Sequence, residues 1–202
     1  MIRIWLLRHG KTEGVAALNG VTDVAVPSSV QQQIAAQVVA LPFARVISSP
    51  LRRCADLAQH IQQARPEIRL DFDPQLQELN FGLFDGQSFS ELASAWPLLE
   101  AFWQDPAQHT LPQAESLADA YQRVTQAWLQ WLAELDRDTL IICHAGTIRL
   151  ILAQVLGVDW RNPHWYSRLN IPYQSVTELT VYRGEPPVVC VNRIGSPLSQ
   201  PL

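Results

Sequence analysis

The sequence predicts an α/β protein with three layers (αβα), in which a mostly parallel central sheet lies between two layers of helices. Short apolar segments alternate along the chain with longer segments whose apolar residues recur every three or four positions. Hydrophobic residues occupy 48% of the 202 positions and charged residues only 17%, which is enough apolar material for a buried core. Neither a repeat nor a linker interrupts this pattern. We therefore expect residues 1–202 to form a single domain.

The first half of the chain begins with a strand and then alternates helices with strands. Residues 31–41 have apolar side chains at helical spacing and stop before Pro42. Ser49 and Pro50 are typical of the N-cap and the first residue of a second helix. Residues 75–87 contain two glycines and are expected to form an irregular loop. The predicted strands are residues 2–7, 45–48 and 68–72, and the predicted helices are residues 31–41 and 51–64.

The second half contains the longest amphipathic segment and the most apolar strand. Glu115 and Ser116 precede a long run of apolar residues at spacings of three and four, so they mark a helix start. Pro97 is expected to interrupt an earlier helical segment, and Gly157 to end the last predicted helix. The predicted helices are residues 89–103, 117–135 and 148–156, and the predicted strands are residues 139–143, 176–182 and 188–194.

The charge of the chain excludes some classes of partner. Fifteen basic and nineteen acidic side chains give a formal charge of −4, which argues against broad binding to nucleic acid or to anionic membranes. A small anionic ligand needs only a local basic pocket. No segment approaches the roughly 20 apolar residues that span a bilayer, and the apolar start of the chain is too short for a signal peptide. Three cysteines without paired spacing indicate neither a disulfide framework nor a zinc site, so we expect a cytoplasmic protein.

Basic residues directly follow three of the predicted strands. Arg8 and His9 follow the first strand, Arg52 and Arg53 begin the helix after the second, and His144 follows the strand at residues 139–143. Each alone is more often a surface or packing residue. Ligands of open α/β sheets bind at the carboxyl ends of the strands, where these residues are expected to meet. Because guanidinium groups hold phosphate oxygens in a fixed fork, the pattern predicts a pocket for a small phosphorylated substrate.

Five segments, in this order along the chain, resemble the motifs of the histidine phosphatase superfamily, the phosphoglycerate-mutase-like group. The resemblance extends from the first strand to the helix after His144, and it implies a phosphoglycerate-mutase-like fold and a single histidine phosphatase domain. The segments are LLRHGKT (residues 6–12), SSPLRRCADLA (48–58), LQELNFGLFDG (76–86), LPQAES (111–116) and ICHAGTIR (142–149).

The resemblance implies a role for each of five residues. His9 would be the nucleophile that accepts the phosphoryl group, and Glu78 would act as general acid and then as general base. Arg8, Arg53 and His144 would bind the phosphate, with His144 also counted among the catalytic residues. The resemblance implies no cofactor, and the sequence has no metal-ligand spacing. We therefore expect a phosphoric monoester hydrolase that works without a metal.

The chain departs from the family pattern at several positions. Lys11 stands where the family often has glutamate, and Val15 stands where an asparagine usually helps to hold phosphate. Ala114 replaces a glycine before Glu115. Arg53, not Arg52, takes the family position of the catalytic arginine, and whether Arg52 shares in phosphate binding is left open.

The length and the segment at residues 19–23 favour one substrate within the family. The chain is short for a mutase, and NGVTD at these positions resembles α-ribazole phosphatases, which remove the 5′-phosphate of α-ribazole 5′-phosphate in cobalamin biosynthesis. A broad small-molecule phosphatase and a phosphoglycerate-mutase-like enzyme stay open as alternatives. Aromatic side chains such as Trp96 could cover the pocket and stack on a heterocyclic base, whereas Trp103 is expected in the core.

Two other hypotheses come from the same residues. Cys143 and Arg149 have the Cys-x5-Arg spacing of cysteine-dependent phosphatases, in which a thiolate attacks phosphorus. That mechanism leaves His9, Arg53 and Glu78 without a shared role, so a buried thiol is the preferred interpretation of Cys143. A catalytically inactive protein that binds a phosphorylated ligand is the second hypothesis. An exposed apolar helix face would also be compatible with a homodimer.

Overall fold

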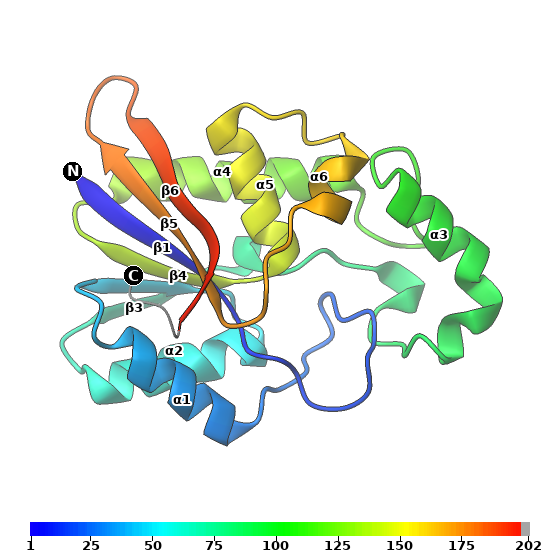
Figure 1. Ribbon diagram of the computed structural model, residues 1–202, viewed down its shortest axis with the longest axis horizontal. Coiled ribbons are helices and arrows are strands. Elements are labelled where there is room, and N and C mark those ends of the chain that lie inside the picture. The colour runs from blue at the N-terminus through cyan, green and yellow to red at the C-terminus, as the bar shows by residue number, and fades with distance from the viewer. Residues whose placement is uncertain (199–202) are drawn as a thin grey trace.

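The computed structural model describes residues 1–198, which contain a single six-stranded sheet in the order β3-β2-β4-β1-β5-β6 (Figure 1). Strands β3, β2, β4 and β1 are parallel to one another, β5 is antiparallel to β1, and β6 is antiparallel to β5. The predicted α/β class and the mostly parallel sheet are thus confirmed. The strands are β1 (Ile2–Arg8), β2 (Arg45–Ser48), β3 (Arg69–Phe72), β4 (Thr139–Cys143), β5 (Ser175–Tyr182) and β6 (Val188–Pro197).

Helices cover both faces of this sheet. In Figure 1, α1 and α2 lie below the strands and α4 and α5 lie above them, while α3 stands beyond one end of the sheet, close to α6. The helices are α1 (Ser28–Val38), α2 (Arg52–Ala64), α3 (Trp96–Gln104), α4 (Leu117–Glu134), α5 (Ala145–Leu156) and α6 (Pro163–Arg168). Short 3-10 turns occur at η1 (Pro74–Leu76), η2 (Gly82–Phe84) and η3 (Glu91–Ala95). No helix within residues 1–198 is both long enough and apolar enough to cross a bilayer.

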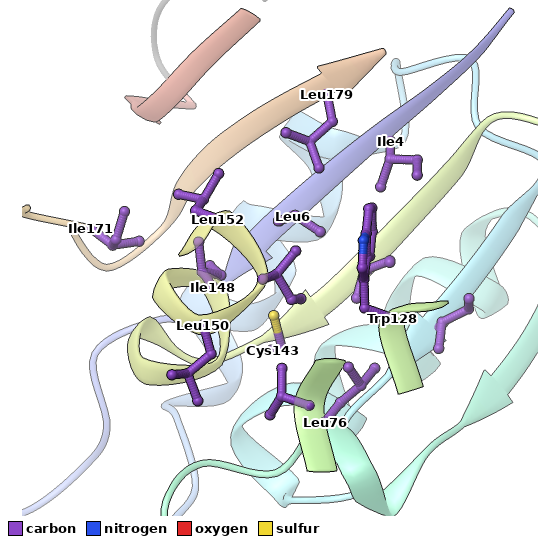
Figure 2. Packing of buried hydrophobic residues seen from close by; sticks show 14 of the residues in the cluster. Ile4, Leu6, Leu76, Trp128, Cys143, Ile148, Leu150, Leu152, Ile171 and Leu179 are labelled. Atoms are coloured by element: carbon purple, nitrogen blue, oxygen red, sulfur yellow. The ribbon is translucent and has the colours of Figure 1, made fainter. Parts of the chain in front are cut away.

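The side chains of β1 alternate between two apolar cores. Ile4 and Leu6 pack with residues of α4 and α5 on one face, as Figure 2 shows, whereas Trp5 and Leu7 pack against α1 and α2 on the other. Each such fully buried large apolar side chain contributes about 1.5–3 kcal/mol relative to exposure. A strand buried on both faces has no polar side, which explains why the IWLL sequence is continuously apolar.

Most differences from the predicted elements lie at helix ends. Helix α2 begins at Arg52, because Leu51 is still extended and the Ser49 hydroxyl instead contacts the backbone N–H of Leu51 and the ring of His144. Helix α1 begins at Ser28, three residues before the prediction, and α5 begins directly after β4. Pro97 does not interrupt a helix, since it lies in the first turn of α3, where no backbone donor is needed. Helix α6 was not predicted at all.

The strand register places the predicted site residues side by side. Arg8 at the end of β1 pairs with Cys143 at the end of β4, so His9 and His144 are the next residues on two adjacent strands. The backbone N–H of His9 donates to the carbonyl of Cys143 at 3.2 Å, which continues the pairing by one residue. Strand β2 pairs with the other side of β4, which brings the first turn of α2 to the same edge.

Candidate active site

His9 lies just beyond the carboxyl end of β1 and is only 6% exposed. Its Nδ1 lies 2.7 Å from the carbonyl oxygen of Gly10, which can only accept, so the ring proton is on Nδ1 and the lone pair is on Nε2. Burial, and after it the nearby positive charge of Arg53, together lower the pKa of His9 to about 3. At neutral pH the ring is therefore uncharged and Nε2 has the lone pair that a nucleophile requires.

Two guanidinium groups lie on either side of this imidazole. The Arg53 side chain is fully buried, and it donates to the carbonyl oxygens of Thr22, at 2.9 Å, and of Gly20. Arg8 donates from Nη1 to the carbonyl oxygen of Ile171 at 2.5 Å, while its Nε is buried without any hydrogen-bond partner in the described part of the chain. Buried donors are rarely left unpaired in a folded protein. The two guanidiniums together place positive charge beside the His9 ring.

His144 lies behind this layer of cations. Its Nδ1 accepts from Arg53 Nε at 3.1 Å, and its Nε2 donates to Ser49 Oγ at 2.9 Å, so both ring nitrogens are already bonded. The ring meets that of His9 edge to face with a centroid distance of 5.1 Å. Direct contact of His144 with the phosphate stays a prediction. Here His144 orients Arg53 and packs against His9, and burial keeps its pKa well below the usual range.

His9 and the two guanidiniums border a cavity of about 180 Å³. Its walls contain two guanidiniums and a single carboxylate, so its charge favours an anion. Among the residues predicted for phosphate binding or catalysis, His144 alone does not line it. The lining residues are Arg8, His9, Thr12, Ala17, Leu18, Asn19, Arg53, Glu78, Phe81 and Tyr173.

Glu78 reaches the cavity from the loop that follows β3. Its Oε2 accepts a hydrogen bond from the backbone N–H of Gly146, in the first turn of α5, at 3.1 Å. A Cβ atom at position 146 would collide with Oε1 of Glu78, so the glycine is what allows the carboxylate to approach the helix. Glu78 also lines a second cavity next to the first. It thus lies at the boundary between the two.

Other predicted candidates lie away from the cavity. Arg52 points toward solvent and lies 3.7 Å from Asp56, so Arg53 is the member of the pair that faces the cavity. Val15, at the position where the family has asparagine, is 74% exposed, and Lys11 is exposed as well. Asn19 lines the cavity instead and offers an amide from a position four residues further along the chain.

The cysteine hypothesis is not supported by this geometry. The Cys143 thiol is fully buried in the core between the sheet and α5, among Leu6, Leu76 and Ile148, as Figure 2 shows. Burial raises the pKa of this thiol well above its usual range, so no thiolate forms at neutral pH. Arg149 lies half-buried at the second cavity, and neither residue lines the cavity that contains His9.

Two residues of the site were not singled out from the sequence, although one of them, Asp85, lies in the segment 76–86 that resembles a family motif. Tyr173 stacks on the Arg8 guanidinium, with 3.7 Å from Cζ to the ring centroid, and its ring also lies 5.6 Å from that of His9. Asp85 accepts from the backbone N–H groups of Val21, Thr22 and Phe81 at 2.8 to 3.0 Å. It thereby joins the loop that bonds Arg53 to the loop that carries Glu78.

Within residues 1–198, no group of three or more histidine, cysteine or acidic side chains is placed to hold a metal ion. The positive charge of the site comes from the two guanidiniums. The site can therefore hold a phosphate group against a neutral imidazole, with a carboxylate beside it, which is the set of groups that phosphoryl transfer to histidine requires.

Comparisons with known proteins agree with this assignment. Residues 4–194 match the family model described as the histidine phosphatase superfamily, branch 1. The chain is 26% identical to a putative phosphoserine phosphatase 2 of Hydrogenobacter thermophilus, over 96% of this chain and 97% of that protein. It is also 26% identical to an adenosylcobalamin/alpha-ribazole phosphatase of Salmonella typhimurium, over 77% and 80% of the two chains. The solved structure of Bacillus stearothermophilus YhfR superposes with a TM-score of 0.85 at 22% identity, covering 97% of this chain and 98% of that one.

Proposed function

This chain belongs to the histidine phosphatase superfamily and is a phosphatase, and we propose that it hydrolyses small phosphate monoesters through a phosphohistidine at His9, without a metal. One arrangement supports this most directly: His9 Nδ1 is bonded to Gly10, its Nε2 has no hydrogen-bond partner within residues 1–198, and the ring lines a cavity together with two guanidiniums. Arg8 and Arg53 would stabilise the charge on the equatorial oxygens during transfer.

The first step transfers the phosphoryl group to the enzyme. His9 Nε2 attacks phosphorus, the N–P bond forms, and the P–O bond to the alcohol breaks. Glu78, which enters this step protonated, gives its proton to the departing alkoxide, and a positioned acid accelerates such a step by about 10²–10⁴-fold. The hydrogen bond from His9 Nδ1 to the Gly10 carbonyl stabilises the positive charge that develops on the ring.

The second step returns the enzyme to its starting state. Glu78, now a carboxylate, removes a proton from a water molecule, and the resulting hydroxide attacks phosphorus. The N–P bond breaks, and inorganic phosphate leaves while His9 recovers its neutral ring. The two steps together consume one water and convert a phosphomonoester into an alcohol and phosphate. Dividing the reaction in this way replaces one difficult displacement by two easier ones.

For the natural substrate we propose α-ribazole 5′-phosphate, in cobalamin biosynthesis. The segment at residues 19–23 and the similarity to the Salmonella protein support this choice. Other relatives at similar identity have printed names with different substrates, such as the putative phosphoserine phosphatase 2. A broad small-molecule phosphatase is therefore the second candidate.

The proposed function is tested by phosphate release from 4-nitrophenyl phosphate and α-ribazole 5′-phosphate in the presence of EDTA. We expect turnover by the parent protein and by Cys143→Ala, but none by His9→Ala. Rapid acid-free quenching with radiolabelled substrate should trap label on the parent protein in a bond that is stable to base and labile to acid, as phosphohistidine is.

Four outcomes would contradict parts of the proposal. Loss of activity in a folded Cys143→Ala variant, with activity retained in His9→Ala, would move the chemistry to the thiol. Inhibition by EDTA that is reversed by a divalent cation would contradict the metal-free mechanism. Binding of substrate without turnover would indicate a phospho-ligand-binding protein, and transfer of phosphate to an added alcohol in preference to water would indicate a mutase.

A further inference from the structure

A second and larger cavity lies next to the phosphate cavity, between α3, α5 and α6. Its volume is about 330 Å³, which is at the small end of the range for ligand sites. It shares two lining residues, Glu78 and Phe81, with the phosphate cavity. The ester oxygen of a substrate joins phosphorus to the alcohol, and this oxygen must receive a proton when the bond breaks. An acidic side chain on the wall shared by the two cavities is suitably placed to give it.

Aromatic side chains form much of the wall of this second cavity. Phe102 and Trp103 come from the C-terminal half of α3, and Tyr166 comes from α6. The Tyr166 hydroxyl donates to the carbonyl oxygen of Trp160 at 2.6 Å, so its polar end already has a partner. Trp103 was expected in the core, but it is 39% exposed and lines this cavity. A planar apolar ligand would cover this exposed ring.

Arg149 is the one guanidinium in the wall of the second cavity. Its Nε donates to the carbonyl oxygen of Leu169 at 2.9 Å, and its two terminal nitrogens have no hydrogen-bond or carboxylate partner within residues 1–198. Burial lowers the pKa of Arg149, although the charge of Glu78 opposes this change. A half-buried guanidinium with free donors is stabilised when a ligand brings an oxygen to it.

From these contacts we propose that the second cavity binds the alcohol part of the substrate, and that this alcohol has a flat apolar ring together with an oxygen substituent that accepts from Arg149. The proposal rests on the phosphatase function given above and defines its substrate class. A hydroxyl and a carboxylate would both serve as the acceptor, since each offers lone pairs to a guanidinium. A nucleoside-like alcohol such as α-ribazole has both features, a flat ring system and sugar hydroxyls.

The aromatic wall is tested with two substrates that differ in the alcohol, phenyl phosphate and sn-glycerol 3-phosphate. We expect Trp103→Ala to raise KM for phenyl phosphate by about tenfold and to leave sn-glycerol 3-phosphate within about twofold. The matched control is Tyr182→Ala, which removes an aromatic ring that is 48% exposed and lines neither cavity. Equal changes for both substrates would overturn the proposed ring site.

The acceptor is tested with phenyl, 3-hydroxyphenyl and 3-carboxyphenyl phosphates. For each substrate the variant is compared with the parent protein, which removes differences in leaving-group acidity. We expect Arg149→Met to raise KM by about tenfold for at least one oxygen-bearing substrate and not for phenyl phosphate, with partial rescue in Arg149→Lys. The substrate that responds identifies a hydroxyl or a carboxylate. The control Arg161→Met removes a surface arginine paired with Asp159.

Failure of this inference is distinguishable from failure of the proposed function. If none of the substrates releases phosphate from the folded parent protein, the phosphatase function itself is contradicted. If all are hydrolysed and Arg149→Met lowers kcat equally for all three aryl phosphates, Arg149 acts on Glu78 or on the fold, and its role as a binding residue for the alcohol is overturned.

Discussion

At the residue scale, the site places two imidazoles, which could become positively charged, beside a guanidinium that is always charged. His9 and His144 are buried beside Arg53, and both the loss of solvent and the neighbouring positive charge disfavour a charged ring. The same environment that attracts a phosphate dianion therefore keeps the imidazoles neutral. A histidine with its ordinary pKa would be partly protonated at neutral pH, and the protonated fraction could not attack phosphorus. Burial keeps the ring in its neutral, nucleophilic form.

This arrangement predicts that the protein loses stability in mild acid. The folded-state pKa of His9, about 3, lies below its unfolded value near 6.5, so the unfolded chain binds more protons between these two values. The contribution of the neutral His9 ring to the free energy of unfolding is complete above pH 6.5 and is lost as the pH falls. At pH 5 the loss for His9 alone is about 2 kcal/mol. Urea unfolding between pH 7 and pH 5, in phosphate-free buffer, measures it.

The comparison variant for this titration is His9→Gln, which cannot become charged. Its free energy of unfolding should fall less steeply with decreasing pH than that of the parent, because only His144 then contributes this effect among the residues of the site. Parallel curves for the two proteins would contradict a depressed pKa at His9.

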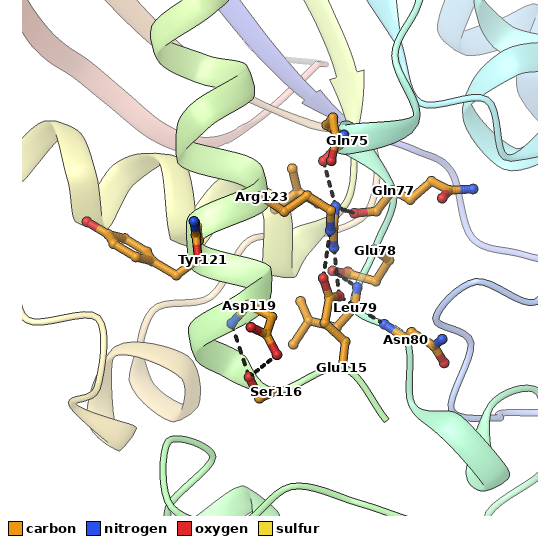
Figure 3. A network of polar contacts seen from close by, with 12 residues as sticks. Gln75, Gln77, Glu78, Leu79, Asn80, Glu115, Ser116, Asp119, Tyr121 and Arg123 are labelled. Atoms are coloured by element: carbon orange, nitrogen blue, oxygen red, sulfur yellow. Dashed lines mark hydrogen bonds and ion pairs between the residues drawn. The ribbon is translucent and has the colours of Figure 1, made fainter. Parts of the chain in front are cut away.

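At the element scale, an ion pair between Arg123 on α4 and Glu115, just before that helix, holds the loop that carries Glu78 (Figure 3). The Arg123 guanidinium binds both oxygens of Glu115, at 2.7 and 2.8 Å, and donates to the carbonyl oxygens of Gln75 and Gln77 at 2.6 and 3.2 Å. Glu115 in turn bonds the backbone of Asn80. These contacts fix the loop on both sides of Glu78, and we infer that Arg123 is a positioning residue for the general acid.

The corresponding prediction concerns Arg123→Met, which removes all four of these hydrogen bonds. A displaced acid should lower kcat by about 10²-fold, since misplacement of a catalytic group by about 1 Å costs that much. The loss should be larger for phenyl phosphate than for 4-nitrophenyl phosphate, whose better leaving group needs less protonation. The two kcat values, measured for parent and variant, test this directly.

If Arg123 only stabilised the fold, its substitution would give a different result in the same assay. It would lower the activity toward both substrates by one common factor. Arg65→Met is the control, because Arg65 also pairs with a carboxylate, Glu67, and donates to a carbonyl oxygen, but lines neither cavity. An equal loss on the two substrates in Arg123→Met would contradict positioning of the acid.

Several elements were predictable because local sequence determines them. Ser116 caps α4 by accepting from the backbone N–H of Asp119, and Gly157 ends α5 with a positive φ of 63°, as their residue types indicate. Helix α6 has only six residues and was missed, since so short a helix has no clear apolar period. Its position depends on tertiary contacts, including the hydrogen bond from Trp165 to the carbonyl oxygen of Arg149.

At the scale of the whole molecule, the sheet order explains which site residues the sequence could identify. Strands β2, β4 and β1 are adjacent and parallel, so residues at their carboxyl ends must meet, and this brings together Arg53, His144 and His9. Glu78 and Tyr173 come from loops outside these strand ends. Strand order alone could not place them: the resemblance to a family pointed to Glu78, and no sequence signal pointed to Tyr173.

The arrangement of the whole site predicts that phosphate stabilises the fold. An anion that binds the native state alone, at a concentration of 100 times its dissociation constant, adds about 2.7 kcal/mol to the free energy of unfolding. For a chain of this size that is a rise in Tm of roughly 5–10 °C. Thermal unfolding with increasing inorganic phosphate, at constant ionic strength and pH 7.5, measures the effect.

The control must separate binding in the cavity from the general stabilisation that phosphate gives by exclusion from protein surfaces. Arg8→Met serves for this, because it removes one of the two guanidiniums of the cavity, while exclusion acts on the whole surface and should be unchanged. The rise in Tm should saturate in the parent and become weak and linear in the variant. The same saturating rise in Arg8→Met would place the bound anion elsewhere and would remove the physical basis for attack by His9.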